Sequence, residues 1–333
     1  MRRPRFKTDG EGFYHVVSRI GGRRFLIDDE EKLILLGMVR AAAEFSGVEV
    51  YTYALMDNHF HLLIRVPRRE EVDDAELERR MQALYGPAQS TRLLGQWAKW
   101  TATGNKTRVE DAKRRLLARM YDLSQFIKTF KESYTQDYNR RHDNTGTIWE
   151  GRFKSILLEG TCRALMAVAA YIHLNPIRAK MVENPELARF TGYGAACAGD
   201  EKAKQGLLAL VIRALYSEPS GQNWAAVRKI CRDAMDGTLG KPPETLAVTN
   251  PYVQTTPNTP NNGNRQGKKQ CPLRELLRQR CLGFLHGGAL GGAAFLQTQA
   301  NLLQSRLRQR SKSMLDNCRE LGLAVLFGTR RVS

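Results

Sequence analysis

Residues 60–66, FHLLIRV, are apolar except for Arg65, and a short apolar run of this length predicts a β-strand. Successive side chains of a strand point to opposite faces of its sheet. His59, His61 and Leu63 are therefore expected on one face, and the residues between them on the other, toward the core. Two imidazoles on one strand face form half of a metal site, although two exposed histidines on a solvated face are the simpler alternative.

A tight turn at Asp57-Asn58 precedes this strand, and residues 48–56 before the turn form a second extended run, so the pair predicts a β-hairpin. Residues 13–19 predict a first strand. Residues 31–45 predict a helix that begins after acidic residues and ends at Gly47.

The chain then becomes helical and highly charged over residues 67–142, and its last helix is expected over 111–141, where apolar residues recur every three to four positions. Residues 154–159 predict a short strand. A helix over 162–174 follows, with Thr161 as its N-cap, and Pro176 ends it. The order β-α-β-β-α-β-α predicts an α+β fold with a ferredoxin-like antiparallel sheet.

The C-terminal third differs in composition. Residues 196–235 predict a helical extension, and residues 236–270 are rich in Pro, Asn, Thr and Gly, as flexible linkers are. Residues 271–333 contain ten Lys or Arg against three Asp or Glu, and they are expected to form a basic, mainly helical region that grips nucleic acid. The alternative is that this region packs back on the preceding domain with its charges in solvent.

The net charge of +18 favours a polyanionic partner, and nucleic acid is preferred to a membrane because no apolar or amphipathic segment accompanies the charge. The basic N-terminus has no apolar stretch behind it, so a signal peptide is not expected. The six cysteines lack paired C-x-x-C spacing, which suits free thiols and a cytoplasmic location.

Tyr171 and Asn175 lie one helical turn apart at the end of the predicted helix 162–174. Together with the histidine pair they could hold a divalent cation, Mg²⁺ or Mn²⁺ suiting such a mixed nitrogen and oxygen site, beside a tyrosine able to attack phosphorus. Tyr134 and Tyr138, also one turn apart, compete with Tyr171 for this role, and spacing alone leaves the choice open.

Four segments, in order along residues 10–195, resemble one family: GFYHVVSRIGGRRFLI, YALMDNHFHLLIRV, SYTQDYNRRHDNTGTIWEGRFKSILLE and AAYIHLNPIRAKMV. The chain resembles the single-tyrosine HUH transposases of the IS-two-hundred type, in particular their REP-associated branch. This resemblance implies a catalytic domain over 1–195 with an inserted helical segment at 67–120. It also implies His59, His61 and Asn175 as metal ligands and Tyr171 as nucleophile.

The expected activity is metal-dependent cleavage and rejoining of single-stranded, hairpin-bearing DNA through a 5′-phosphotyrosine, by a monomer or a homodimer. Arg152 and Lys154 are candidate phosphate contacts, and Arg23 and Arg24 are weaker ones. Trp149 and Phe153 could stack on bases or be buried. The alternatives are a non-catalytic regulator that binds hairpin DNA or RNA, and a metal hydrolase that uses an activated water.

Overall fold

The computed structural model of the chain describes residues 6–215, 223–237, 288–292, 294–299, 314–318 and 323–327. Its strands are β1 (Gly12–Arg19), β2 (Glu49–Met56), β3 (His59–Val66), β4 (Lys154–Leu158), β5 (Ala289–Gly291), β6 (Met314–Cys318) and β7 (Leu323–Phe327). The helices of the first half are α1 (Asp29–Ser46), α2 (Asp74–Ala102), α3 (Lys106–Leu117) and α4 (Leu123–Arg141). Those that follow are α5 (Cys162–His173), α6 (Asn175–Arg178), α7 (Gly192–Cys197), α8 (Glu201–Leu215) and α9 (Trp224–Asp236), with 3₁₀ turns at Gly21–Arg23 and Pro185–Leu187.

The strands form one sheet in the order β2-β3-β1-β4-β5-β7-β6. Its first four strands pair antiparallel, with β1 between β3 and β4, as the ferredoxin-like order predicts. The expected α+β fold, the hairpin over residues 48–66 and the order of elements up to α5 are therefore confirmed.

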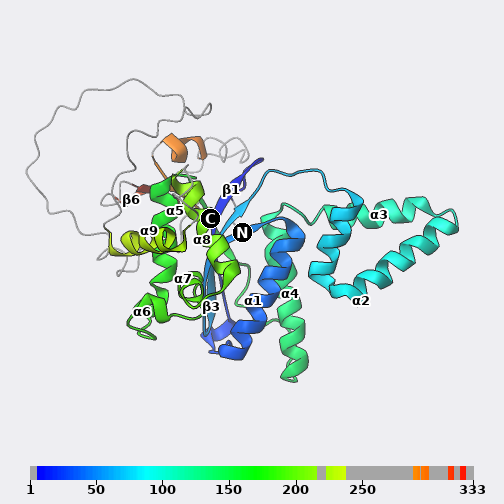
Figure 1. Ribbon diagram of the computed structural model, residues 1–333, viewed down its shortest axis with the longest axis horizontal. Coiled ribbons are helices and arrows are strands. Elements are labelled where there is room, and N and C mark those ends of the chain that lie inside the picture. The colour runs from blue at the N-terminus through cyan, green and yellow to red at the C-terminus, as the bar shows by residue number, and fades with distance from the viewer. Residues whose placement is uncertain are drawn as a thin grey trace, which may run out of the picture.

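Helices cover both faces of the sheet (Figure 1). α1 and α4 lie on one side, and α5, α7, α8 and α9 lie on the other. Because side chains alternate along β3, successive residues contact helices on opposite sides of the sheet. Phe60 packs on Phe130 of α4, with ring centroids 5.5 Å apart, whereas His61 faces Tyr171 of α5.

Local sequence sets the ends of several helices. Asp28 accepts a hydrogen bond from the backbone N–H of Glu31 and caps α1, which ends at Gly47 in the left-handed conformation with φ of 69°. Thr161 caps α5 through the N–H of Ala164, as expected.

The insertion forms a helical arm that projects from the sheet (Figure 1). α2 bends at Gly86 with φ of 77° but continues to Ala102. The arm has a small core of its own, which joins the end of α1 at Phe45 and contains Leu77, Met81, Trp97 and Met120. The prediction of one continuous helix over 111–141 is wrong, because α3 ends at Leu117 and α4 begins at Leu123 with Asp122 as its N-cap.

The C-terminal region departs from the mainly helical expectation. Its described residues contain three strands, and residues 294–299 are helical. β5 pairs parallel with β4, at Leu157 with Ala289 and at Leu158 with Leu290, and so extends the sheet of the first domain. Leu296 is fully buried in the main core. At these residues the region packs back on the domain, the alternative given above. The linker at 236–270 lies almost wholly outside the described residues.

Among the described helices, none has the length and apolar character needed to cross a bilayer. Cys162, Cys197 and Cys231 are free thiols.

Candidate active site

His59 and His61 leave the same face of β3, with ring centroids 5.1 Å apart and ring planes 76° from parallel. His59 is half-buried at the end of the strand, whereas His61 is 1% exposed. The expectation that both imidazoles share one face, with Phe60 anchored in the core on the other, is confirmed by these contacts.

Each ring is held at Nδ1. His59 Nδ1 lies 2.7 Å from Asn58 Oδ1, and Asn58 in turn donates from Nδ2 to the carbonyl of Arg23. His61 Nδ1 lies 2.9 Å from His15 Nε2. With Nδ1 engaged in both rings, a metal ion would be bound through the two Nε2 atoms, and the partners at Nδ1 would fix the tautomers.

His15 is a site residue that the sequence reasoning did not single out. It is fully buried on β1, and its ring stacks on that of His61 at 18° with centroids 5.1 Å apart. The two meet because Val17 pairs with His61 in the β1–β3 ladder, so His15 lies diagonally next to it on the same face. Nothing in the sequence gives this register directly.

Tyr171 lies over the histidines from α5. Its ring centroid is 5.9 Å from those of both His61 and His15, and the residue is 1% exposed. The guanidinium carbon of Arg178, on α6, lies 3.9 Å from the Tyr171 ring centroid in a cation–π contact. Arg178, which the sequence reasoning did not single out, thus contacts the candidate nucleophile. Its position seven residues after Tyr171, two helical turns, was the available signal.

Asn175 is buried at the junction of α5 and α6. Its Nδ2 donates to the carbonyls of Tyr171 and Ile172, and its Oδ1 accepts a 2.6 Å hydrogen bond from Arg178. In this arrangement the side chain caps the end of α5. It can serve as a metal ligand only through the remaining lone pair of Oδ1 or after Arg178 moves.

The histidine pair fits a divalent cation. Burial, followed by the charges of His15 and His59, holds the pKa of His61 well below its ordinary value, so this imidazole is neutral as a metal ligand must be. The described residues contain no group of three or more His, Cys, Asp or Glu placed to share a metal. The available donors are thus two imidazoles and the Asn175 amide, an open set that leaves coordination positions for phosphate or water.

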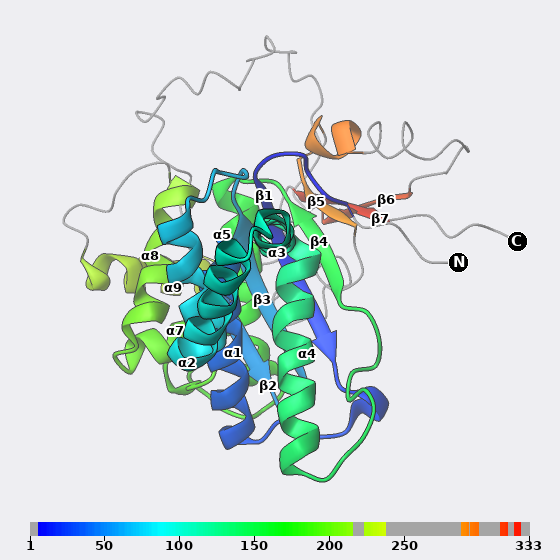
Figure 2. The same cartoon turned by 90° about the vertical axis from the view of Figure 1, so that its right-hand side faces the viewer.

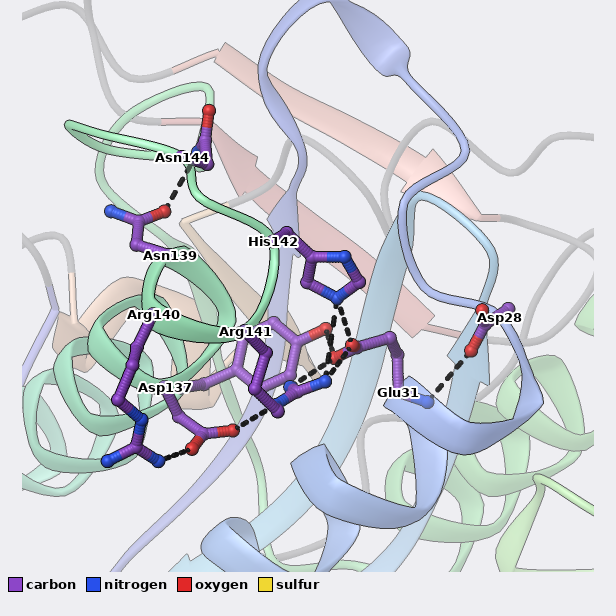
Figure 3. Close-up of polar contacts among 9 residues, drawn as sticks. Asp28, Glu31, Asp137, Asn139, Arg140, Arg141, His142 and Asn144 are labelled. Carbon is purple, nitrogen blue, oxygen red and sulfur yellow. Dashed lines mark hydrogen bonds and ion pairs between the residues drawn. The ribbon is translucent and has the colours of Figure 1, made fainter.

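The competing tyrosines lie on the other side of the sheet, on α4. Tyr134 is fully buried, and its hydroxyl donates to Glu31 Oε2 at 2.8 Å, while Tyr138 stacks on His142. Arg141 and His142 also bind the carboxylate of Glu31 (Figure 3). The structure therefore places these tyrosines in the contact between α1 and α4, away from the histidine pair.

The candidate DNA contacts are exposed. Arg152 and Lys154 line a hollow of about 200 Å³ that includes Arg19, the residue paired with His59 in the β1–β3 ladder. Arg23 and Arg24 are exposed in and after the 3₁₀ turn, next to Asn58. Trp149 and Phe153 are 6% and 8% exposed, which supports burial rather than open stacking surfaces.

Comparison with protein families identifies the segment that carries the histidines. Residues 11–76 match the family model described as IS200-like transposase. The chain resembles the IS200-like transposases. The matched residues span β1, α1 and the β2–β3 hairpin, and so include His15, His59 and His61.

A solved structure of a REP-associated tyrosine transposase bound to a REP hairpin matches with 12% identity and a TM-score of 0.37. The match covers 60% of this chain and 84% of that one. A search of curated proteins found none that matches the chain.

Proposed function

We propose that the chain is a transposase-like strand transferase that cleaves and rejoins single-stranded DNA through a covalent bond to Tyr171. The observation that carries this proposal is the contact between the Tyr171 ring and His61, on facing elements, with centroids 5.9 Å apart. Tyr134 and Tyr138 are engaged elsewhere, with Glu31 and His142. The resemblance to IS200-like transposases over residues 11–76 points to the same class of reaction.

In the proposed reaction, the Tyr171 oxygen attacks the scissile phosphorus and loses its proton. The bond from phosphorus to the 3′ oxygen breaks, and that oxygen takes up a proton, which leaves a 5′-phosphotyrosine and a free 3′-OH. Attack by a 3′-OH on the phosphotyrosine reverses these steps and rejoins the strands. The phosphoester energy is kept in the covalent link, so no external energy source is required.

His59 and His61 would hold Mg²⁺ or Mn²⁺ through Nε2, with Asn175 as the third protein donor. The cation would supply Lewis-acid polarisation of a phosphate oxygen. Arg178 contributes positive charge next to the Tyr171 ring, which favours negative charge on the attacking oxygen. Because Tyr171 is 1% exposed, DNA binding has to uncover its oxygen. With Arg178 in place, Asn175 would bind the cation through the remaining lone pair of Oδ1.

The proposed substrate is single-stranded DNA that carries hairpins, and the proposed setting is the cytoplasm, with the chain acting as a monomer or a homodimer. Four basic residues are exposed around the end of β1 and the turn before His59, and they would contact the phosphates of this DNA: Arg152, Lys154, Arg23 and Arg24.

The test is covalent capture. The full chain is incubated with Mn²⁺ and labelled hairpin oligonucleotides with single-stranded flanks, and an SDS-resistant protein–DNA adduct is expected. Tyr171→Phe removes only the attacking oxygen and should abolish the adduct while DNA binding remains. Tyr134→Phe and Tyr138→Phe are the matched controls and should retain it.

Two results would contradict this assignment. An adduct that survives in Tyr171→Phe but disappears in Tyr134→Phe would move the nucleophile to α4. DNA binding by the wild type without any adduct across the set of oligonucleotides would favour the non-catalytic regulator, and cleavage without an adduct would favour a hydrolase that activates water.

A further inference from the structure

A groove of about 660 Å³ lies outside the candidate active site and is lined by residues of α4 and of the segment 146–153. Figure 2 shows the chain after α4 running back beside this helix into β4. Residues spaced by four along α4, one helical turn, line it in two rows. The inner row is largely buried and consists of Ile127, Lys131 and Thr135. The outer row consists of the half-buried Ser124 and the exposed Lys128, Glu132 and Gln136.

Hydrogen bonds within the chain hold the floor of the groove in place. Trp149 donates from Nε1 to Thr135 Oγ1 at 2.9 Å, and this bond fixes the indole against α4. Lys131 Nζ donates to Ser18 Oγ at 2.7 Å and to the carbonyl of Gly151 at 3.2 Å. Because these bonds join α4 to β1 and to the opposite wall, the groove has a defined shape before anything enters it.

The charged residues that line the groove, and its position in the molecule, indicate which kind of ligand it binds. Lys128 and Arg152 stand exposed on its two walls, and Glu132 is the acid among its lining residues. Gly151 and Arg152 also line the smaller hollow that contains Arg19, the ladder partner of His59. The groove and the hollow therefore share lining residues, and together they extend from α4 to Arg19 at the end of β1.

We propose that this groove binds the unpaired DNA segment that flanks the scissile phosphate, so that phosphates face Lys128 and Arg152 and nucleobases lie against the groove floor. The volume lies within the range of sites that enclose small organic ligands. Exposed cations on the two walls, Lys128 and Arg152, can follow the phosphates of a single strand. Lys128 also lies 3.9 Å from Glu132, the acid on the same wall. This inference rests on the proposed function, because it needs single-stranded DNA to be the substrate.

The experiment compares three labelled DNAs by fluorescence anisotropy, with the full chain in EDTA so that binding is measured without metal-dependent chemistry. One DNA is a blunt hairpin, and the other two carry an unpaired extension on the 5′ or on the 3′ side. The wild type is expected to bind one of the extended hairpins about tenfold more tightly than the blunt one.

Two substitutions at exposed positions of α4 test the groove directly. Gln136→Trp fills it, and Lys128→Glu reverses the charge of one wall. Both should remove most of the gain from the extension and leave binding of the blunt hairpin within about twofold. Gln96→Trp and Lys99→Glu are matched controls at exposed positions of α2 and should keep the gain. Glu132→Gln should enlarge the gain, because it removes a negative charge from the groove.

The outcomes separate this inference from the proposed function. If the gain persists in both Gln136→Trp and Lys128→Glu, or if the extensions give no gain in the wild type, the groove does not hold the single strand. Binding of the blunt hairpin then leaves the proposed function standing. If no DNA binds at all, the proposed function fails, and this inference fails with it.

Discussion

His15 is the residue that holds the candidate ligand His61 in one orientation. If His61 binds a cation through Nε2, its Nδ1 carries the proton and donates it to His15 Nε2, 2.9 Å away. His15→Ala should therefore weaken Mn²⁺ binding by about 10-fold to 100-fold, the usual effect of losing such a partner. Titration calorimetry measures this affinity directly, and circular dichroism checks that the variant is folded.

The matched control for that measurement is His142→Ala, which removes a histidine on the other side of the sheet, at Glu31. It should leave Mn²⁺ affinity unchanged. A folded His15→Ala protein with the affinity of the wild type would show that the stacked histidine is only part of the core.

Removal of either proposed ligand should abolish the chemistry. His59→Ala and His61→Ala are expected to lose the covalent adduct as completely as EDTA treatment of the wild type does. The loss should amount to several kcal/mol of transition-state stabilisation, at least about a thousandfold in rate. Single-turnover cleavage of a labelled oligonucleotide measures it. Undiminished cleavage in EDTA would mean that the histidines are structural.

Single residues were predictable where the signal is local. Strand alternation placed His59 and His61 on one face, and helical spacing placed Asn175 one turn from Tyr171. His15 was missed because its contact depends on how β1 and β3 align, which no local pattern specifies. Which of Tyr134 and Tyr171 faces the histidines depends on which side of the sheet each helix covers, and spacing could not decide that.

At the scale of elements, Glu31 of α1 is the acceptor of the hydrogen bonds that join α1 to α4 and the residue after it. Burial by itself raises the pKa of this carboxyl, but hydrogen bonds from Arg141, His142 and Tyr134 outweigh it and lower the pKa to about 2. A lowered pKa stabilises the fold above the ordinary value of 4.5, and this stabilisation is lost as pH falls toward 2. The contribution at neutral pH is about 3 kcal/mol.

Glu31→Gln should therefore lower the free energy of unfolding at pH 7 and flatten its decline between pH 4.5 and pH 2. Urea unfolding followed by circular dichroism at several pH values provides the comparison. The matched control is Glu30→Gln, one residue earlier on the exposed surface of α1, which should follow the wild-type curve. A Glu31→Gln curve parallel to that of the wild type would show that the cluster contributes little.

Element boundaries followed the sequence where a cap defines them, as at Asp28, Gly47 and Thr161. The break between α3 and α4 was missed because its causes are distant. Tyr121 adopts a positive φ of 54° there, its N–H donates to the carbonyl of Ser46, and its hydroxyl accepts from Arg80. These partners belong to α1 and α2, so the apolar spacing across residues 111–141 could not reveal the interruption.

At the scale of the whole molecule, the C-terminal region completes the sheet. A chain that ends at residue 237 would lose β5 and the buried side chains of Leu290 and Leu296. It should unfold at a lower temperature, with a loss of about 3 kcal/mol or more from the two leucines. Differential scanning calorimetry of this chain, and of a second chain ending at residue 299 that keeps β5 and Leu296, measures the effect.

The second truncation should recover most of the lost stability, because it restores the pairing with β4. Equal stability of the 237-residue chain and the full protein would instead favour the independent, linker-tethered grip that the composition of residues 236–333 suggests. The sequence could not show the pairing at residues 289–291, since the segment is short and its partner lies far away in the chain.

The pairing of β4 with β5 also sets an order of events during synthesis. Leu157 leaves the ribosome 132 residues before Ala289, its partner in the sheet. At about 5 to 20 residues per second, the outer edge of β4 stays unpaired for roughly 7 to 26 seconds. An open edge of this kind recruits other strands. The nascent chain is therefore most prone to aggregation in this interval, and slow translation of residues 160–288 would lengthen it.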